Sequence, residues 1–217
     1  MLRILFISLI VLKTITVYSQ DTTSAFGVQI SYNLYNFKVA KTPLYTGDAK
    51  NGLSYGLRFE NSLTRNLFLL TGISYAPVKV QFDFTSSNLI NLPSAARKSQ
   101  LKLHYINVPV LLKYTMIDMG FYKLSPAAGV LNNLILMHKE ETIYSDNTLR
   151  ESSFFTNNLN IYTPSVMLSA INEFYFNEKY FISLEPNFRY DLSTFNDELI
   201  STPRTVFGVA MAVSYRY

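Results

Sequence analysis

Apolar and polar residues alternate with a period of two along most of this chain. In residues 26–34 every second residue is large and apolar, and the residues between them are Gly27, Gln29, Ser31 and Asn33. Such alternation is typical of a strand with two different faces, whereas an amphipathic helix repeats every three to four residues. The pattern predicts eight strands, over residues 26–34, 53–60, 67–84, 99–114, 121–138, 160–176, 179–193 and 204–217.

The links between these strands alternate between short and long. Three are tight, with the sequences NSLTRN, TMIDMG and FNEK, and the other four are longer and polar. Outer-membrane barrels have short turns at one end, long loops at the other, and both chain ends beside the short turns. The sequence therefore predicts an all-β fold, an eight-stranded antiparallel up-and-down transmembrane β-barrel.

The two faces of the predicted strands differ in a way that favours a membrane. In residues 204–217 one row is large and apolar and ends in Tyr215 and Tyr217, while the other row is mostly small. The large row is expected to face lipid, because a soluble sheet would place many charges on its outer face. A lipocalin-like soluble barrel is the structural alternative. The charges predicted to point inward are Arg58, Glu60, Lys113, Glu173, Glu185, Arg189, Asp191 and Arg216.

These inward charges suggest a function for the lumen. Eight strands enclose a space just wide enough for side chains to fill it. Acidic and basic residues are balanced in the set, as a closed lumen requires, because a buried charge without a partner costs several kcal/mol. The cluster is therefore interpreted as a salt-bridged structural plug, and a conducting channel is the alternative.

Composition changes the picture only slightly. Charged residues make up 16% of the chain, below the roughly 25% usual for soluble domains, and there is no cysteine. Disulfides and thiolate metal sites are therefore excluded. The formal net charge is +4, but no basic run or stripe stands out, so nucleic acid is not an expected partner.

The segment MLRILFISLIVLKTITVYSQ has a short basic start and an apolar run, and it has Val17 and Ser19 at the third and first positions before Gln20, as signal peptidase prefers. It predicts a secretory signal peptide over residues 1–19, cleaved before Gln20, and a barrel domain over residues 20–217. A retained anchor helix is the alternative, but the apolar run is shorter than the roughly 20 residues that a spanning helix needs. The expected location is the bacterial outer membrane.

Five prolines fall inside the predicted strands, where a missing N–H is unfavourable. They are Pro77, Pro109, Pro126, Pro164 and Pro186. The apolar residues change face at Pro77, which predicts a β-bulge there. Pro109, at the centre of HYINVPVLLKY, is predicted to mark a bulge or an unpaired site that faces the lumen.

Candidate catalytic chemistry is sparse. An enzyme of the outer membrane would need a histidine near a nucleophile or acid, and the spacing of the available residues fixes no triad or metal geometry. They are interpreted as polar residues near loop bases, and neither a cofactor nor a metal is expected. The residues considered are His104, His138, Glu140, Glu141, Ser145 and Asp146.

Three motifs carry a resemblance to a known family. YINVPVLLKY is similar to the fourth-strand pattern, leiPlllKY, of the PorT-like outer-membrane β-barrels of Bacteroidota. ISLEPNFRYDLS resembles the family's seventh-strand pattern leaRYsygL, with Glu185, Arg189, Tyr190 and Leu192 at matching positions, and VSYRY resembles the closing lgyrF. The chain departs from the pattern at Pro186 and Asn187, and in ending with tyrosine instead of phenylalanine.

This resemblance implies a non-enzymatic barrel that is structural or accessory to an envelope or secretion assembly. It also implies that Tyr215 and Tyr217 form the signal read by the barrel-assembly machinery. Outer-membrane lipid and, through the external loops, envelope or secretion-complex proteins are the expected partners. The alternatives are a narrow pore for ions or small solutes and, last, an outer-membrane enzyme.

Overall fold

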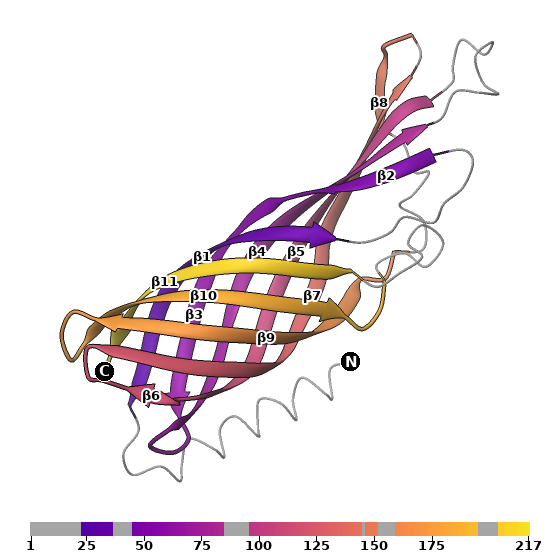
Figure 1. Cartoon of the computed structure of the whole chain (residues 1–217). Helices are drawn as coiled ribbons and strands as arrows, with labels where there is room; N and C mark the ends of the chain where they lie inside the picture. Colours follow the sequence, from indigo (N-terminus) through magenta and orange to yellow (C-terminus); the bar gives the residue numbers. More distant parts are fainter. Residues whose placement is uncertain (1–22, 37–44, 85–95, 145, 152–158, 195–203) are drawn as a thin grey trace.

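The computed structural model describes residues 23–36, 45–84, 96–144, 146–151, 159–194 and 204–217, which form one sheet of eleven strands (Figure 1). The strands are β1 (Ser24–Asn36), β2 (Tyr45–Lys50), β3 (Gly52–Ser62), β4 (Leu67–Phe84), β5 (Ala96–Tyr114), β6 (Ile117–Asp118), β7 (Tyr122–Tyr144), β8 (Leu149–Glu151), β9 (Tyr162–Tyr175), β10 (Tyr180–Asp191) and β11 (Thr205–Arg216). The eight predicted strands correspond to the eight long ones. The predicted signal peptide, residues 1–19, lies outside the described residues.

The eight long strands close into an antiparallel barrel. They pair in the order β1, β3, β4, β5, β7, β9, β10 and β11, and β11 returns to β1. The closing pair runs from Ala25 opposite Arg216 to Asn36 opposite Thr205. Closure leaves no open edge in the barrel wall, so the backbone can satisfy its polar groups without water, as lipid requires. The predicted fold class is confirmed.

Ser24 and the C-terminus lie at the same end of the barrel as the short turns, which we call the turn end (Figure 1). In the turn after β9, the Asn177 side-chain oxygen accepts hydrogen bonds from the amides of Lys179 and Tyr180, at 2.9 and 2.8 Å. In the turn after β6, Gly120 has a φ of 77° and its amide donates to Asp118 at 3.0 Å. These residue types suit tight turns. The longer links lie at the opposite loop end and include β2 and β8, which the sequence pattern did not predict.

Side chains alternate strictly across the barrel wall. On β11, Phe207, Val209 and Met211 are exposed on the outside, and Ala210 and Ala212 are buried inside. The interior is too narrow for large residues on every strand. A Cβ on Gly208, for example, would lie within 2.9 Å of the side-chain oxygens of both Asn33 and Asn187. The predicted assignment of large residues to the outer face and small residues to the inner face is confirmed for this strand.

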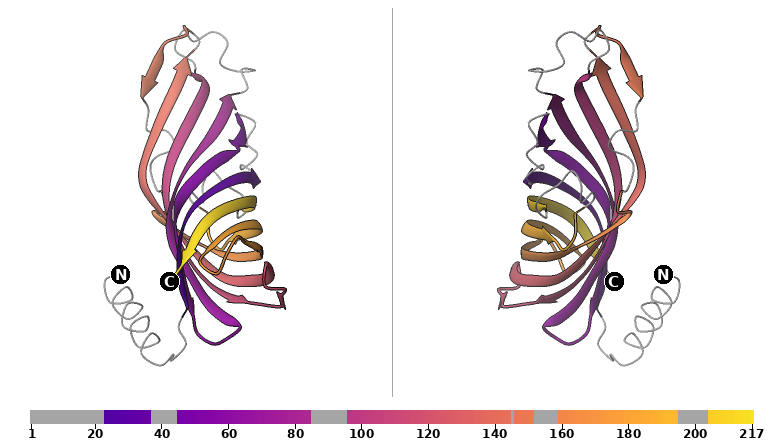
Figure 2. Two further views of the ribbon diagram at one scale, coloured as in Figure 1. Left: turned by 90° about the vertical axis from the view of Figure 1, so that its left-hand side faces the viewer. Right: turned by 90° about the vertical axis from the view of Figure 1, so that its right-hand side faces the viewer.

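β4, β5 and β7 continue beyond the barrel at the loop end, where β2 pairs with β4 and β8 pairs with β7 (Figure 2). We call residues 76–84, 96–105 and 135–144, with β2 and β8, the extension. Its inner face holds an apolar core, with Ser99, Glu140 and Thr142 as buried polar exceptions, whereas the inner face of the barrel is largely polar. The core residues are Ala76, Val78, Val80, Phe82, Leu101, Leu103, Tyr105 and Ile135. Among the described residues, no helix has the length and apolarity needed to cross a membrane.

The apolar core of the extension explains the change of hydrophobic phase at Pro77. The buried residues of β4 are at even-numbered positions all the way from Phe68 to Phe82, on both sides of Pro77. The pairing register with β5 does not shift either. The predicted bulge at Pro77 is therefore wrong. Apolar residues change face because the outside of the strand meets lipid in the barrel and water in the extension. A register shift does occur on β7, where Leu136 is the extra residue between the partners of Tyr105 and His104.

Pro109 lies on the inner face of β5, in a gap in the pairing with β4. The pairs on either side of the gap, Thr71 with Val110 and Ser74 with Asn107, keep one register. The predicted bulge is wrong. Pro109 does face the lumen and is unpaired toward β4, as predicted, but on its other side it pairs with Leu131 of β7. Pro186 lies in a similar gap between β9 and β10. Each gap accommodates the missing N–H of a proline without moving the strand.

Candidate functional site

A network of five charged side chains crosses the lumen near the turn end. The ammonium group of Lys113 lies 2.7 Å from Glu60 and 2.5 Å from Glu173. The guanidinium of Arg58 contacts Glu60 at 3.3 Å, Glu173 at 3.8 Å, and also Glu185. The side chains of Lys113 and Glu173 are each only 1% exposed. We call Arg58, Glu60, Lys113, Glu173 and Glu185 the lumen network.

The network joins opposite walls of the barrel. Arg58 is on β3 and Glu173 is on β9, and these strands are four places apart in the ring of eight in either direction. Their contact therefore spans the full width of the lumen. Ser183 donates to Glu185 at 2.6 Å, and Arg58 donates to Ser183 at 3.2 Å. The neutral hydroxyl of Ser183 thus adds hydrogen bonds to both ions of this pair. Such additional hydrogen bonds are needed to offset the cost of removing ions from water.

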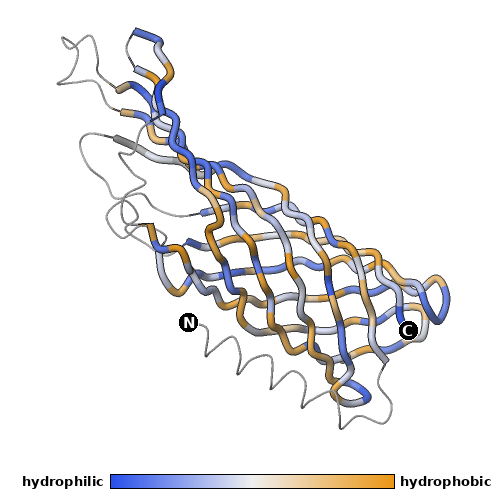
Figure 3. The backbone as a smooth tube through the Cα atoms, turned by 180° about the vertical axis from the view of Figure 1, so that it is seen from behind, coloured by the Kyte–Doolittle hydropathy of each residue, from blue (hydrophilic) through white to orange (hydrophobic). Residues whose placement is uncertain are grey.

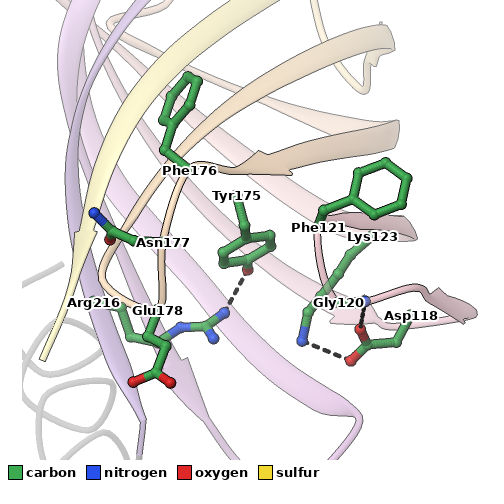
Figure 4. Close-up of a pocket in the computed structure, with 9 residues that line it drawn as sticks. All are labelled: Asp118, Gly120, Phe121, Lys123, Tyr175, Phe176, Asn177, Glu178 and Arg216. Carbon is green, nitrogen blue, oxygen red and sulfur yellow. Dashed lines mark hydrogen bonds and ion pairs between the residues drawn. The ribbon is translucent and has the colours of Figure 1, made fainter.

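Arg216 connects to the network through a tyrosine rather than directly. Its guanidinium donates to the Tyr175 hydroxyl (Figure 4). That hydroxyl donates in turn to Glu173 at 3.1 Å. Arg216 and Tyr175 line an open cavity of about 490 Å³ at the turn end. Lys123 also lines this cavity and contacts Asp118 at 2.7 Å. The hydrogen bond from Lys123 lowers the pKa of Asp118.

A second charged group lies nearer the loop end. Asp191 accepts a hydrogen bond from Ser165 at 2.6 Å and forms an ion pair with Arg204 at 2.7 Å. The Arg204 guanidinium also lies 5.0 Å from the centre of the Tyr105 ring. Arg189 donates to Asn33, a neutral partner, and its Nε has no hydrogen-bond partner among the described residues. Counted over those residues, this group has more positive than negative charge.

The eight charged residues expected inside the barrel all lie on its inner face, but they do not form one cluster. Five form the lumen network, Arg216 joins it through Tyr175, and Arg189 and Asp191 lie in the second group. Arg204 and Tyr175 were missed. Both lie within the predicted strands 160–176 and 204–217 and in their inward-facing rows, so assigning every polar residue of these rows to the lumen would have identified them.

The described candidate catalytic residues lie on both faces of the extension and have different partners. Glu140 is buried and accepts a hydrogen bond from Ser99 at 2.9 Å, whereas Glu141 faces outward toward Lys102. His104 contacts Tyr75, and Ser145 lies outside the described residues. In the part of the chain that the structure describes, no group of three or more acidic or histidine residues is arranged to hold a metal ion.

The two C-terminal tyrosines lie at the turn end. Tyr215 is on the outer face of β11, and its ring lies 5.1 Å from that of Tyr180 and 6.5 Å from that of Tyr217, measured between centroids. Aromatic residues at this level are typical of the girdle where a barrel wall leaves the bilayer.

Comparison with known proteins supports the membrane interpretation. A family model described as an outer membrane protein beta-barrel domain matches residues 18–199. No curated protein matches the chain. The solved structures with similar folds include the outer membrane protein OprG from Pseudomonas aeruginosa, at 11% identity and a TM-score of 0.51, covering 90% of this chain and 95% of that one. They also include the outer membrane protein AlkL in lipid bilayers, at 10% identity and a TM-score of 0.50, covering 91% and 90%. At these identities the likeness shows the fold alone.

Proposed function

This chain belongs to the outer membrane protein beta-barrel domain family, and from that membership we propose that it is a non-enzymatic barrel with a closed lumen. The protein is located in the outer membrane, with lipid around its wall. The observation that supports a closed lumen is the contact of Arg58 with Glu173 across the full width of the barrel. Ions that entered from either end would have to break a buried, hydrogen-bonded charge network.

Conductance across a planar bilayer tests this closure. The purified wild-type protein is expected to give no steady openings. Replacing both Arg58 and Glu173 with alanine removes the contact across the lumen, and this double variant should open a small conductance. The same change at Glu178, an exposed residue of the turn after β9, is the matched control and should stay silent. Steady openings by the wild type would refute the closed lumen and favour the alternative, a narrow pore for ions or small solutes.

We also propose that the barrel serves as a structural or accessory part of a larger envelope assembly. A PorT-like role in secretion rests only on the sequence resemblance of the motifs around Pro109, Arg189 and the C-terminus. Tyr215 and Tyr217 are proposed as the signal for the barrel-assembly machinery, since the last strand ends in exposed aromatic side chains. Changing both tyrosines to serine should then reduce the amount of folded protein in the membrane.

Co-purification tests the accessory role. The tagged protein, extracted in mild detergent from its native membrane, should bring with it one or a few envelope proteins in fixed ratio. A matched preparation of a different barrel at equal abundance should not bring the same proteins. Recovery of the protein alone, under conditions that preserve other membrane complexes, would count against the accessory role.

A further inference from the structure

Two arginines lie close together on the inner face of the barrel near the loop end, and a single carboxylate accompanies them. Arg189 of β10 is directly opposite Val206 of β11, and Arg204 lies two residues before Val206 with its side chain also buried. Residues placed diagonally in this way have side chains about 7–8 Å apart. Asp191 forms an ion pair with Arg204 at 2.7 Å, whereas among the described residues no carboxylate lies at ion-pair distance from Arg189. Two arginines against one aspartate leave one positive charge unbalanced.

Both arginines are removed from water. Arg189 is 8% exposed and Arg204 is 5% exposed. Hydrophilic and hydrophobic positions alternate along the strands of the wall, so that polar residues gather inside (Figure 3). In the described part of the chain, the hydrogen-bond partner of the Arg189 guanidinium is the side-chain oxygen of Asn33, which is neutral. A buried charge without a counter-ion is costly, so Arg189 needs a negative charge that the described residues do not supply.

The unpaired polar atoms of this region are mostly donors. Six buried side-chain atoms of the described residues have no hydrogen-bond partner, and none of the six belongs to the lumen network. They are Arg189 Nε, Arg204 Nη1, Tyr105 Oη, Thr163 Oγ1, Ser193 Oγ and Asn187 Oδ1. The two nitrogens and the three hydroxyls can donate, and only the amide oxygen cannot. This excess of donors favours a ligand that accepts hydrogen bonds.

We propose that the loop-end half of the lumen binds a small molecule through one carboxylate, which Arg189 and Arg204 hold between them. The planar guanidinium group donates two parallel hydrogen bonds to a carboxylate, and the charges make these bonds strong. Tyr105 supplies a further donor, since the Arg204 guanidinium lies 5.0 Å from the centre of its ring. A carboxylate carries the one negative charge that the group lacks, whereas a phosphate monoester carries about −1.5 to −2 at neutral pH. The ligand is therefore a small monocarboxylate.

Fluorine NMR of the purified protein in detergent tests this site. The probes are trifluoroacetate and trifluoroacetamide, which has nearly the same shape but no charge. The wild type is expected to bind trifluoroacetate at least about tenfold more tightly than the amide. Arg189→Gln should abolish this preference. Acetate should displace trifluoroacetate more effectively than sulfate does, and the reverse order would overturn the assignment of the ligand as a carboxylate.

The matched control is Arg65→Gln, the same substitution at an exposed arginine in the turn between β3 and β4. It should bind both probes like the wild type. The change of gel mobility on heating shows whether each variant is folded. If Arg189→Gln does not fold, Tyr105→Phe gives an independent test, because it removes one unpaired donor and keeps the ring, and it should weaken the binding of trifluoroacetate severalfold. Equal binding of the two probes by the wild type would overturn the proposal, as would an unchanged preference in folded Arg189→Gln or in Tyr105→Phe.

Discussion

The barrel and its extension share three strands but have opposite distributions of polarity. In the barrel the outer face is apolar, and the inner face holds ions such as Lys113 and Glu173. In the extension the inner face holds Val80 and Leu103, and the outer face holds charges such as Lys79. The strands pass from one region to the other without a change of register between β4 and β5. The surrounding medium thus decides which face of a continuous strand is apolar.

The comparison predicts that the barrel depends on its internal ions, and Lys113→Met tests this most strongly. The substitution would leave Glu60, Glu173 and Glu185 buried with only Arg58 as their partner in the network. We expect a loss of about 3–5 kcal/mol in the free energy of unfolding, because an uncompensated buried charge is left behind. Urea unfolding in detergent micelles, followed by the gel-mobility difference between folded and unfolded barrel, measures the loss.

The control for that experiment is Lys179→Met, which removes an exposed charge from a turn and should change stability by less than about 0.5 kcal/mol. Equal stability of Lys113→Met and the wild type would show that the ions contribute nothing to holding the barrel together.

The extension should instead depend on apolar packing. Leu103 is completely buried in its core, so Leu103→Ala would leave a cavity. We expect a loss of about 2–3 kcal/mol, at the low end for such changes because the site lies near the loop end and can partly relax. Limited proteolysis should show faster cleavage in the extension while the gel mobility of the barrel stays unchanged. Cleavage at the wild-type rate would mean that the core does not hold the extension together.

Restoring a backbone N–H donor at position 109 should have a smaller effect. The pairs of β4 and β5 on both sides of the gap keep one register, so the strands need not move to close it. In Pro109→Ala the new amide can complete the missing pairing with β4, and the gain of a hydrogen bond roughly offsets the lost rigidity of proline. The net change should be below about 1 kcal/mol. Hydrogen exchange should reveal a slowly exchanging amide at position 109, and rapid exchange there would show that the gap has a cause other than the proline.

The smallest expected effect is at the turn end, where charges meet water. The pKa of Asp118 is lowered by its hydrogen bond with Lys123, so its ionised form stabilises the fold. This contribution is present above the ordinary pKa near 3.8 and is lost as the pH falls through the lower folded value. Asp118→Asn should cost less than about 1 kcal/mol at pH 7, and the cost should shrink as the pH falls below 3.8. A cost that stayed constant with pH would point to a steric role for the side chain.

Periodicity alone predicted the strands and the direction of most side chains, because each barrel strand separates two different media and so alternates strongly. It misassigned Pro77 because one pattern, a change of phase, has two physical causes: an inserted residue or a change of medium. The real insertion, at Leu136, lies on β7 among neighbouring apolar residues and leaves no clear mark in the sequence. The division of the charges into two groups depends on the height of each residue along the barrel, which strand stagger sets and the alternation does not reveal. Arg204 was missed although it is the first residue of the predicted strand 204–217 and lies in its inward-facing row.

The pairing of β1 with β11 also determines how the chain must fold. Ala25 meets Arg216, so the seam joins the first and last described strands and can form only after β11 is available. Until then the intermediate is an open sheet with two unpaired edges, which readily bind other strands and aggregate. Contacts between such distant residues also make folding slow. Loss of β11 would therefore yield an aggregation-prone sheet and not a smaller barrel.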